Sequence, residues 1–416
     1  MATAVAVATQ PRMSKWRSFI AVESVAEAID PIPSCPQRAG PRAEMDGRTM
    51  ARQGNRTALA ALAMLTMGAT APAPVRIEPV PADRPPQGPS LPLHVGGRGL
   101  IQGDVLRRQW PGSYIEAGFA DDSADLRIGP GDVRLHILVD GRPAATLVKP
   151  KPGLYRLTGL GKGQHRLRVE VGSESQAGAT LLGGVYARHP LPVRPRARRI
   201  EFIGDSHTVG YGNTADGQTC TPDQVWDTTD TSQGIAGQLG RRYDADYRVN
   251  AISGRGVVRN YNGFAADPLP AAYRYTLFDH DHAADDRGWR PQLYVVALGT
   301  NDFSTALHQG EAWADRAALH RDYETRYAAF LRDLHAANPR AHIFVWATDK
   351  ADGEIAAEAG KVVEQLRAQG IADIGFATLK GLSFGGCNSH PTVADDRRIA
   401  DAVAGYVDAH PTLWSR

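Results

Sequence analysis

The sequence is poor in cysteine, in long apolar runs and in net charge. Three cysteines occur in 416 residues, and 47 Lys and Arg residues nearly balance 45 Asp and Glu residues. A nucleic-acid-binding protein needs a clustered basic face, so the balanced charge disfavours that class. No Gly-rich phosphate-binding loop is present, and no apolar run approaches the about 20 residues of a membrane-spanning helix. The composition, 42% hydrophobic with 43 Gly and 28 Pro, is typical of a globular protein with many turns.

A secretory leader is predicted over residues 45–73. Basic residues come first, an apolar run over 58–65 follows, and small residues then form an Ala-X-Ala cleavage pattern. Because the leader starts inside the chain, we expect translation to begin at Met45 or Met50, with residues 1–44 a mis-annotated upstream segment. The alternative is a disordered cytosolic tail. We therefore expect a secreted or periplasmic protein that has no membrane association after signal cleavage.

Three further segments follow from changes in composition and periodicity. Residues 74–95 are rich in proline and are predicted as an extended linker. Residues 96–193 carry short runs that alternate apolar and polar residues, which predicts an all-β sandwich. Residues 194–416 alternate apolar strands with helices, which indicates a parallel sheet covered on both faces. In this last segment strands are predicted at 199–204, 246–252, 292–299, 342–348 and 371–377, and helices at 232–242, 318–337, 354–369 and 392–408.

Four polar, glycine-containing stretches punctuate the α/β segment. They are Gly204-Asp205-Ser206, Ser253-Gly254-Arg255-Gly256, Gly299-Thr300-Asn301-Asp302 and Gly386-Cys387-Asn388-Ser389-His390-Pro391. The carboxyl ends of strands in an open α/β sheet meet at the edge where ligands bind. Each stretch alone can also be interpreted as a helix cap, a turn or a surface loop, but four of them in this order indicate a site.

The residue types in these stretches fit nucleophilic catalysis. The hydroxyl of Ser206 is a weak nucleophile until a base takes its proton, and His390 can serve as that base. Glycines such as Gly254 let backbone N–H groups approach a ligand closely, and the amide of Asn301 can donate to a developing oxyanion. His207, beside Ser206, is predicted to have a structural role.

In sequence and order the four stretches resemble the blocks of the SGNH (GDSL-type) hydrolase superfamily. The longer forms Gly204–Gly212, Ser253–Gly256 and Gly299–Ser304 resemble carbohydrate esterase family 2 more narrowly. That family places a jelly-roll β-sandwich before the SGNH domain, so the resemblance covers roughly residues 96–410. It implies an α/β fold class: a C-terminal SGNH-hydrolase three-layer α/β/α domain with a parallel sheet at 194–416, preceded by an all-β jelly-roll sandwich domain.

The resemblance also implies a role for each site residue. Ser206 would be the nucleophile and His390 the general base. The Ser206 N–H, the Gly254 N–H and the Asn301 amide would form the oxyanion hole.

The last block departs from the superfamily pattern. Many SGNH enzymes carry an aspartate three residues before the histidine, where this chain has Cys387. Either a backbone carbonyl or Asn388 would then orient the imidazole, and the sequence leaves this choice open. After removal of the leader the chain keeps Cys220 and Cys387, an even count that permits one disulfide in an exported protein. We predict this bridge, which would join two loops at the site.

The predicted function is that of a secreted serine esterase. It would remove O-acetyl groups from polysaccharide or oligosaccharide of the xylan or mannan type, through an acetyl-enzyme. The alternatives are an SGNH esterase acting on a lipid or aryl ester, and a non-catalytic carbohydrate-binding protein. His280-Asp281-His282 fits no common zinc spacing and is predicted as a solvated acidic loop, so neither a metal nor a cofactor is expected. No nucleic-acid partner is expected, and the sequence does not predict the oligomeric state.

Overall fold

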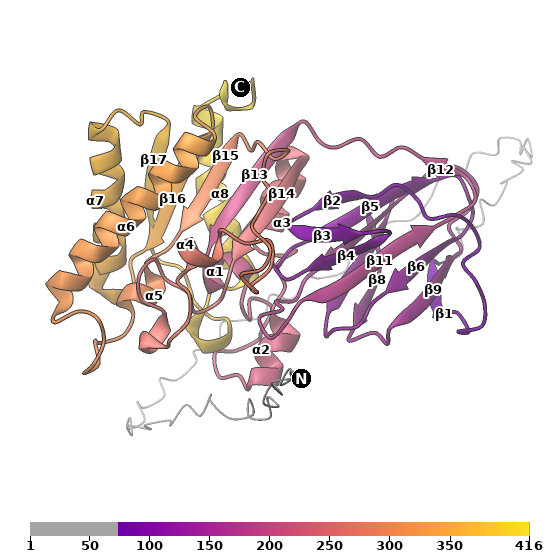
Figure 1. Ribbon diagram of the computed structural model, residues 1–416, viewed down its shortest axis with the longest axis horizontal. Coiled ribbons are helices and arrows are strands. Elements are labelled where there is room, and N and C mark those ends of the chain that lie inside the picture. Colours follow the sequence, from indigo (N-terminus) through magenta and orange to yellow (C-terminus); the bar gives the residue numbers. More distant parts are fainter. Residues whose placement is uncertain (1–73, 416) are drawn as a thin grey trace, which may run out of the picture. The chain divides into compact units, whose positions relative to one another are not determined.

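Residues 74–415 are described by a computed structural model, and they form an antiparallel β-sandwich followed by a parallel α/β domain (Figure 1). The predicted upstream segment 1–44 and the predicted leader 45–73 lie outside the described residues, so both stay predictions. Within the described part of the chain, no helix combines the length and the apolar character needed to cross a membrane.

The sandwich is built from twelve strands that pair only in antiparallel fashion in the described chain. They are β1 (Arg76–Pro79), β2 (His94–Gly96), β3 (Gly99–Gln102), β4 (Val105–Arg108), β5 (Tyr114–Phe119), β6 (Ala124–Ile128), β7 (Arg134–Val139), β8 (Arg142–Val148), β9 (Gly153–Thr158), β10 (His165–Val171), β11 (Thr180–Tyr186) and β12 (Pro190–Leu191). One sheet has the order β1-β9-β6-β11-β4-β3, and the other has the order β12-β5-β10-β7-β8 with β2 paired to β5. Along β7 the buried residues Leu135, Ile137 and Val139 alternate with half-buried ones, as expected for a strand with one face on a core.

The prediction of an extended linker over residues 74–95 is wrong for much of its length. β1 pairs with the edge of β9, β2 pairs with β5, and Ser90 forms a bridge to Tyr186. This stretch therefore belongs to the sandwich. Proline favours an extended backbone both in linkers and in edge strands, so composition alone does not distinguish the two.

The α/β domain has a five-stranded parallel sheet with the order β14-β13-β15-β16-β17. Its strands are β13 (Arg198–Gly204), β14 (Ala245–Ala251), β15 (Leu293–Ala297), β16 (His342–Thr348) and β17 (Ile374–Leu379), and its long helices are α3 (Ile235–Tyr243), α6 (Arg316–Ala337), α7 (Glu354–Ala368) and α8 (Val393–Ala409). Each of these elements overlaps a predicted one, and the predicted fold class is confirmed.

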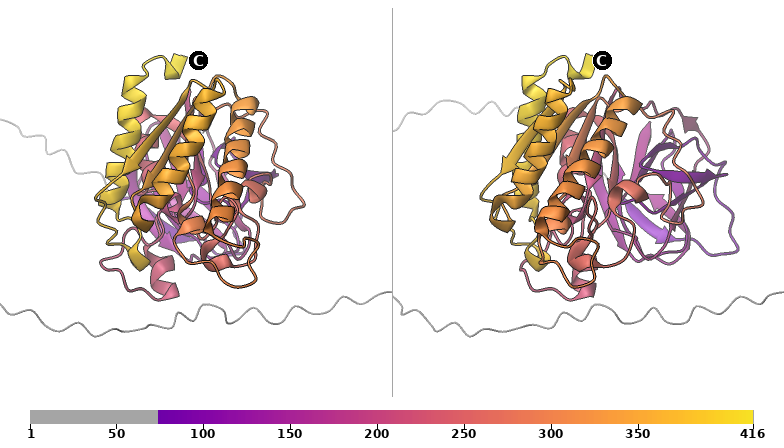
Figure 2. Two further views of the ribbon diagram at one scale, coloured as in Figure 1. Left: turned by 90° about the vertical axis from the view of Figure 1, so that its left-hand side faces the viewer. Right: turned by 60° about the vertical axis from the view of Figure 1, so that its left-hand side comes forward.

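Successive residues of the interior strand β13 face different helix layers. Phe202 packs in a core that contains residues of α3 and α8, whereas Ile203 packs in a core that contains residues of α6 and α7. A strand buried on both faces reads as a continuous apolar run because helices cover both sides. The result is a three-layer arrangement (Figure 2).

Short helical turns at and beyond the strand ends were not predicted. They are α1 (Ser206–Val209), α2 (Pro222–Thr228), α4 (Leu269–Ala272), α5 (Thr300–Phe303), η1 (Tyr261–Gly263), η2 (Ala351–Gly353), η3 (Cys387–Ser389) and η4 (Leu413–Ser415). With three to seven residues each, they are too short to show a hydrophobic period. Three of them, α1, α5 and η3, contain or adjoin the polar stretches identified in the sequence.

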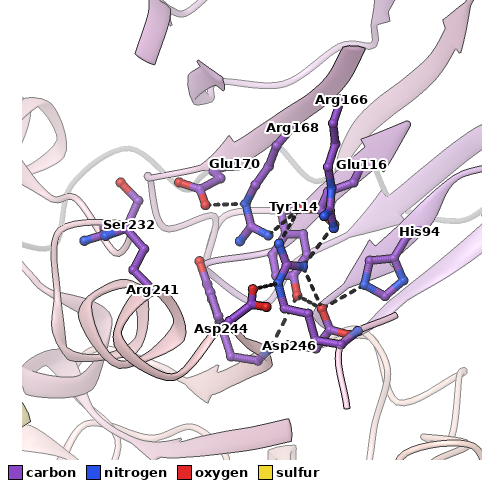
Figure 3. A network of polar contacts seen from close by, with 12 residues as sticks. His94, Tyr114, Glu116, Arg166, Arg168, Glu170, Ser232, Arg241, Asp244 and Asp246 are labelled. Atoms are coloured by element: carbon purple, nitrogen blue, oxygen red, sulfur yellow. Dashed lines mark hydrogen bonds and ion pairs between the residues drawn. The ribbon is translucent and has the colours of Figure 1, made fainter. Parts of the chain in front are cut away.

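A polar network joins the sandwich to the α/β domain (Figure 3). Glu116 of β5 accepts hydrogen bonds from Arg168 and Arg196, each at 2.9 Å, and Asp246 of β14 contacts His94 at 2.8 Å and Arg196 at 3.0 Å. Burial acts to raise the pKa of Glu116, but the two guanidinium groups outweigh it and bring the pKa to about 2. Both carboxylates are therefore charged and paired, which fixes the sandwich on the domain that carries the polar stretches.

Candidate active site

Ser206 follows the carboxyl end of the interior strand β13, as the first residue of α1. The side chain of Asp205 caps α1 by accepting a hydrogen bond from the His207 N–H at 3.0 Å. Gly204 leaves no room for a side chain, because a Cβ there would lie 2.1 Å from the Thr208 hydroxyl. The capping role thus falls to Asp205, and the Ser206 hydroxyl is left for other partners.

The Ser206 hydroxyl lies 2.8 Å from Nε2 of His390, although 184 residues separate the two in sequence. The imidazole is half-buried and packs on Tyr211, with ring centroids 4.3 Å apart. A hydroxyl in hydrogen-bond contact with an imidazole is the arrangement of a nucleophile and its general base. The structure therefore brings together the two residues predicted to carry the chemistry.

Backbone carbonyl groups hold the other side of the His390 ring. Nδ1 lies 2.9 Å from the Cys387 carbonyl oxygen and 3.1 Å from that of Asn388. Both partners only accept, so Nδ1 carries the proton and Nε2 presents its lone pair to Ser206. The Asn388 side chain instead donates to the Tyr211 hydroxyl at 3.0 Å. Of the two possibilities, the geometry favours the carbonyl, and the Asn388 side chain does not contact the ring.

The η3 turn makes this orientation possible. Asn388 and Ser389 both adopt the left-handed conformation, with φ of 52° and 57°. Asparagine enters this region more readily than most residues. The turn brings the Cys387 and Asn388 carbonyl oxygens to Nδ1 of His390, so that peptide oxygens orient the ring where the chain lacks the aspartate.

Gly254 lies beyond the end of β14 and Asn301 beyond the end of β15, the two strands that pair with β13 on either side. The Asn301 amide nitrogen donates to the Arg255 carbonyl oxygen at 2.8 Å and to the Asp205 carboxylate at 3.2 Å. Both amide protons therefore have acceptors here. Donation to an oxyanion at Ser206 would require the longer bond, to Asp205, to open. Gly254 has φ of +83°, a conformation that glycine adopts without strain.

Asp302, interpreted from the sequence only as a cap, holds the backbone that directly follows the second polar stretch. Its carboxylate accepts the backbone N–H groups of Val257, Val258 and Arg259, each at 2.9 Å. Burial raises the pKa of Asp302 to about 6, against the opposing effect of these N–H groups. A Cβ at Gly256 would lie 2.5 Å from the carboxylate, so glycine is required for this close approach. Its position beside Asn301 was the only sequence signal for this role.

Cys220 and Cys387 form a disulfide that spans 167 residues. The Cys387 N–H also donates to the Gly212 carbonyl at 3.2 Å, and a Cβ at Gly212 would lie 2.3 Å from Cys387 Cβ. Since the Cys387 carbonyl holds the His390 ring, the bridge anchors the loop that orients the imidazole.

We expect Cys220→Ser to lower the free energy of unfolding by about 4–5 kcal/mol, because the bridge closes a long loop in the unfolded chain. Urea unfolding of the variant and of the oxidised and reduced wild type measures this difference. The variant should match the reduced protein, whose stability should lie below that of the oxidised form. Two free thiols titrated in the unreduced, denatured mature protein would contradict the bridge.

The remaining histidines singled out in the sequence lie in different surroundings. His207 is buried, stacks on Trp346 at a centroid distance of 6.4 Å, and has a pKa lowered well below its usual value by burial. A neutral, packed ring fits a structural role. His280 pairs with Asp267, and within residues 74–415 no group of three or more His, Cys, Asp or Glu side chains is arranged to hold a metal ion.

Two family models match the chain. A carbohydrate esterase 2 N-terminal model covers residues 95–193, and a GDSL-like lipase/acylhydrolase family model covers residues 202–412. Among curated proteins, the chain is 38% identical over 333 residues to an acetylxylan esterase/glucomannan deacetylase of Cellvibrio japonicus, covering 78% of this chain and 92% of that protein. It is 28% identical to the cellulase/esterase CelE of Acetivibrio thermocellus, covering 72% of this chain and 37% of that protein.

Solved structures give the same likeness. A carbohydrate esterase whose active site displays divergent catalytic and non-catalytic binding functions matches with a TM-score of 0.75 and 36% identity, over 78% of this chain and 100% of that chain. A family two carbohydrate esterase from Clostridium thermocellum in complex with cellohexaose matches with a TM-score of 0.68 and 25% identity, over 77% of this chain and 100% of that chain.

Proposed function

We propose that the chain, which belongs to the GDSL-like hydrolases with a carbohydrate esterase 2 N-terminal domain, is a serine esterase that removes O-acetyl groups from xylan- or mannan-type polysaccharide. The proposal proceeds from its membership of this family, which makes it a carboxylic ester hydrolase acting as a carbohydrate esterase. The observation that carries the proposal is the 2.8 Å contact between the Ser206 hydroxyl and Nε2 of His390. The relative named acetylxylan esterase/glucomannan deacetylase supports the substrate class.

In the proposed mechanism, Ser206 Oγ attacks the acetyl carbonyl carbon while His390 Nε2 takes the hydroxyl proton. The tetrahedral intermediate collapses, the sugar oxygen leaves with the proton from His390, and an acetyl-enzyme remains. Water then attacks this ester with His390 again as base. Acetate departs and the proton returns to Ser206. The chemistry requires no cofactor.

The negative charge of the tetrahedral intermediate falls on the former carbonyl oxygen. We assign its stabilisation to the N–H groups of Ser206 and Gly254 and to the Asn301 amide, because fixed donors in a site of low polarity contribute most where charge develops. The raised pKa of Asp205, to about 7, is caused mainly by burial. A carboxyl group that is neutral for part of the time binds the Asn301 amide less firmly, which favours transfer of that donor to the oxyanion.

The acid limb of the pH profile is a first test of His390. Burial lowers the pKa of His390 to about 4, and the nearby Lys350 cation acts in the same direction. A base works only when neutral, so kcat/KM should hold its plateau down to about pH 5 and fall as the pH drops through about 4. Lys350→Met removes the cation, should raise the pKa of His390, and should move the limb to higher pH.

The matched control for this shift is Lys350→Arg, which keeps the charge near the Ser389 carbonyl that Lys350 contacts at 2.9 Å. Circular dichroism across the same pH range excludes unfolding as the cause. A limb that stays in place, or moves to lower pH, in Lys350→Met would contradict the assignment.

A substrate series separates the proposal from its alternatives. Rates on 4-nitrophenyl acetate, on longer 4-nitrophenyl acyl esters, and of acetate release from acetylated xylan and glucomannan should be compared. We expect acetyl esters to be preferred and polysaccharide to be deacetylated. Faster turnover of long acyl chains would favour a lipid or aryl esterase. Binding of polysaccharide without hydrolysis of any ester would favour a non-catalytic binding protein.

We also propose that the protein is exported and that its mature chain begins between Ala71 and Val75, on the strength of the leader pattern. N-terminal sequencing of protein recovered from the periplasm or culture medium measures this start. Recovery of exported protein that retains residues 1–44 would contradict the prediction.

A further inference from the structure

A loop of the sandwich reaches the turn that carries Gly254. The loop lies between β10 and β11, and two of its side chains hold the backbone of Ser253. Glu174 Oε1 accepts the Ser253 N–H at 2.8 Å, and Gln176 Nε2 donates to the Ser253 carbonyl oxygen at 3.2 Å. Gln176 Nε2 also donates to Glu174 Oε1 at 3.1 Å. We call Glu174 and Gln176 the sandwich clamp.

The loop that bears the clamp is itself anchored by the residues between. Ser173 Oγ accepts the Arg134 N–H at 3.0 Å, and Ser175 Oγ accepts from the buried Arg108 guanidinium at 2.7 Å. Ser173 and Ser175 thus bind the sandwich, while the clamp residues bind the α/β domain, in the alternation of an extended chain. The Gln109 side chain adds a third tie, to the Gln176 carbonyl oxygen at 3.2 Å. The clamp is therefore held on a rigid support.

Holding the Ser253 carbonyl also orients the Gly254 N–H. The two groups belong to one peptide unit, which is planar, so their directions are fixed relative to each other. Gly254 has a positive φ. Because glycine can adopt many backbone conformations, hydrogen bonds to the neighbouring peptides are needed to restrict this turn to one of them. Gln176 holds the carbonyl of this peptide, and Glu174 holds the N–H on the preceding side. Backbone bonds hold the flanking groups, from the Tyr261 N–H to the Gly254 carbonyl oxygen at 2.9 Å and from the Arg255 N–H to the Ile252 carbonyl oxygen at 3.3 Å.

The hydrogen bonds of the clamp compensate for the burial of the Glu174 carboxyl group. Ser253 is buried, and Glu174 is partly buried in a site where burial raises its pKa. Burying a carboxylate is costly unless hydrogen bonds satisfy it. Here the bonds that satisfy it lead directly to the residue preceding the oxyanion glycine.

We propose that Glu174 and Gln176 are positioning residues of the esterase, which align the Ser253–Gly254 peptide so that the Gly254 N–H meets the oxyanion. The inference rests on the proposed function. If so, the sandwich contributes directly to catalysis, because the α/β domain alone would lack Glu174 and Gln176.

The test compares four variants on 4-nitrophenyl acetate and on acetylated xylan. Glu174→Ala and Gln176→Ala should each lower kcat roughly 10- to 100-fold with KM changed less than about threefold, because a misplaced oxyanion donor weakens transition-state binding. Glu174→Gln keeps the acceptor for the Ser253 N–H and should recover most of the rate. Glu78→Ala, in the exposed edge strand β1, should behave as wild type.

Hydrogen exchange provides a readout that does not depend on activity. Peptides covering residues 250–264 should exchange faster in both alanine variants and at the wild-type rate in Glu174→Gln and Glu78→Ala. If the wild type hydrolyses no acetyl ester, the proposed function fails, and exchange alone then decides on the clamp.

The proposal is overturned by unchanged exchange, by a kcat within twofold of wild type in both alanine variants, or by an effect confined to KM, which would indicate a substrate contact. If Glu174→Ala does not fold, Gln176→Ala decides the question, because the exposed Gln176 side chain can be truncated with little cost to the core.

Discussion

Ser206→Ala should reduce hydrolysis of 4-nitrophenyl acetate to the uncatalysed background. Removing the nucleophile of a serine hydrolase costs on the order of 10⁶ in kcat. The fold should survive, because the cap of α1 is made by the Asp205 side chain and the Ser206 hydroxyl contacts His390. Initial rates, with Tm from circular dichroism alongside, measure both parts of this expectation.

Ser304→Ala is the matched control for this substitution, since Ser304 is exposed at the end of α5 and the same hydroxyl is removed. It should retain the wild-type rate. A Ser206→Ala protein that still deacetylates at the wild-type rate would overturn the whole catalytic scheme.

His390→Ala should be nearly as severe, with a loss of kcat on the order of 10⁴–10⁶, because without the imidazole the Ser206 hydroxyl keeps its proton. The structure adds a sharper expectation for Asn388. Only its backbone carbonyl contacts the ring, at 3.1 Å, and its φ is 52°. Asn388→Gly keeps both the carbonyl and the left-handed conformation, so kcat should fall less than about 10-fold. Steady-state kinetics of the two variants measure the contrast.

Asn388→Ala serves as the control for backbone conformation. It lacks the side-chain bond to Tyr211, as Asn388→Gly does, but alanine pays about 1–2 kcal/mol in the left-handed region. It should therefore be less stable than Asn388→Gly. A loss of kcat in Asn388→Gly as large as that in His390→Ala would mean that the amide, and not the carbonyl, orients the imidazole.

The division into two domains was predictable because its signals are local. A strand with one solvent face alternates apolar and polar residues, as over 134–137, whereas a strand covered on both faces is continuously apolar, as over 343–347. Such periods depend only on near neighbours in the chain. The proline-rich stretch 74–95 shows where this fails, since an edge strand and a linker share the same backbone preference and differ only in whether a partner strand is present.

The candidate site divides in the same way. The residue types and their order were sufficient to single out Ser206, Gly254, Asn301 and His390, because parallel strands bring their carboxyl ends to one edge.

The sequence alone determined the fold class, the likeness to the family and the residues able to carry the chemistry. Only the tertiary structure decided how those residues are held: a peptide oxygen in place of the missing aspartate at His390, Asp302 on three backbone N–H groups, and the sandwich clamp on Ser253. The physical reason is that these contacts join atoms brought together by the packing of distant segments, and most involve backbone groups, which every residue possesses and which therefore leave no mark in the sequence.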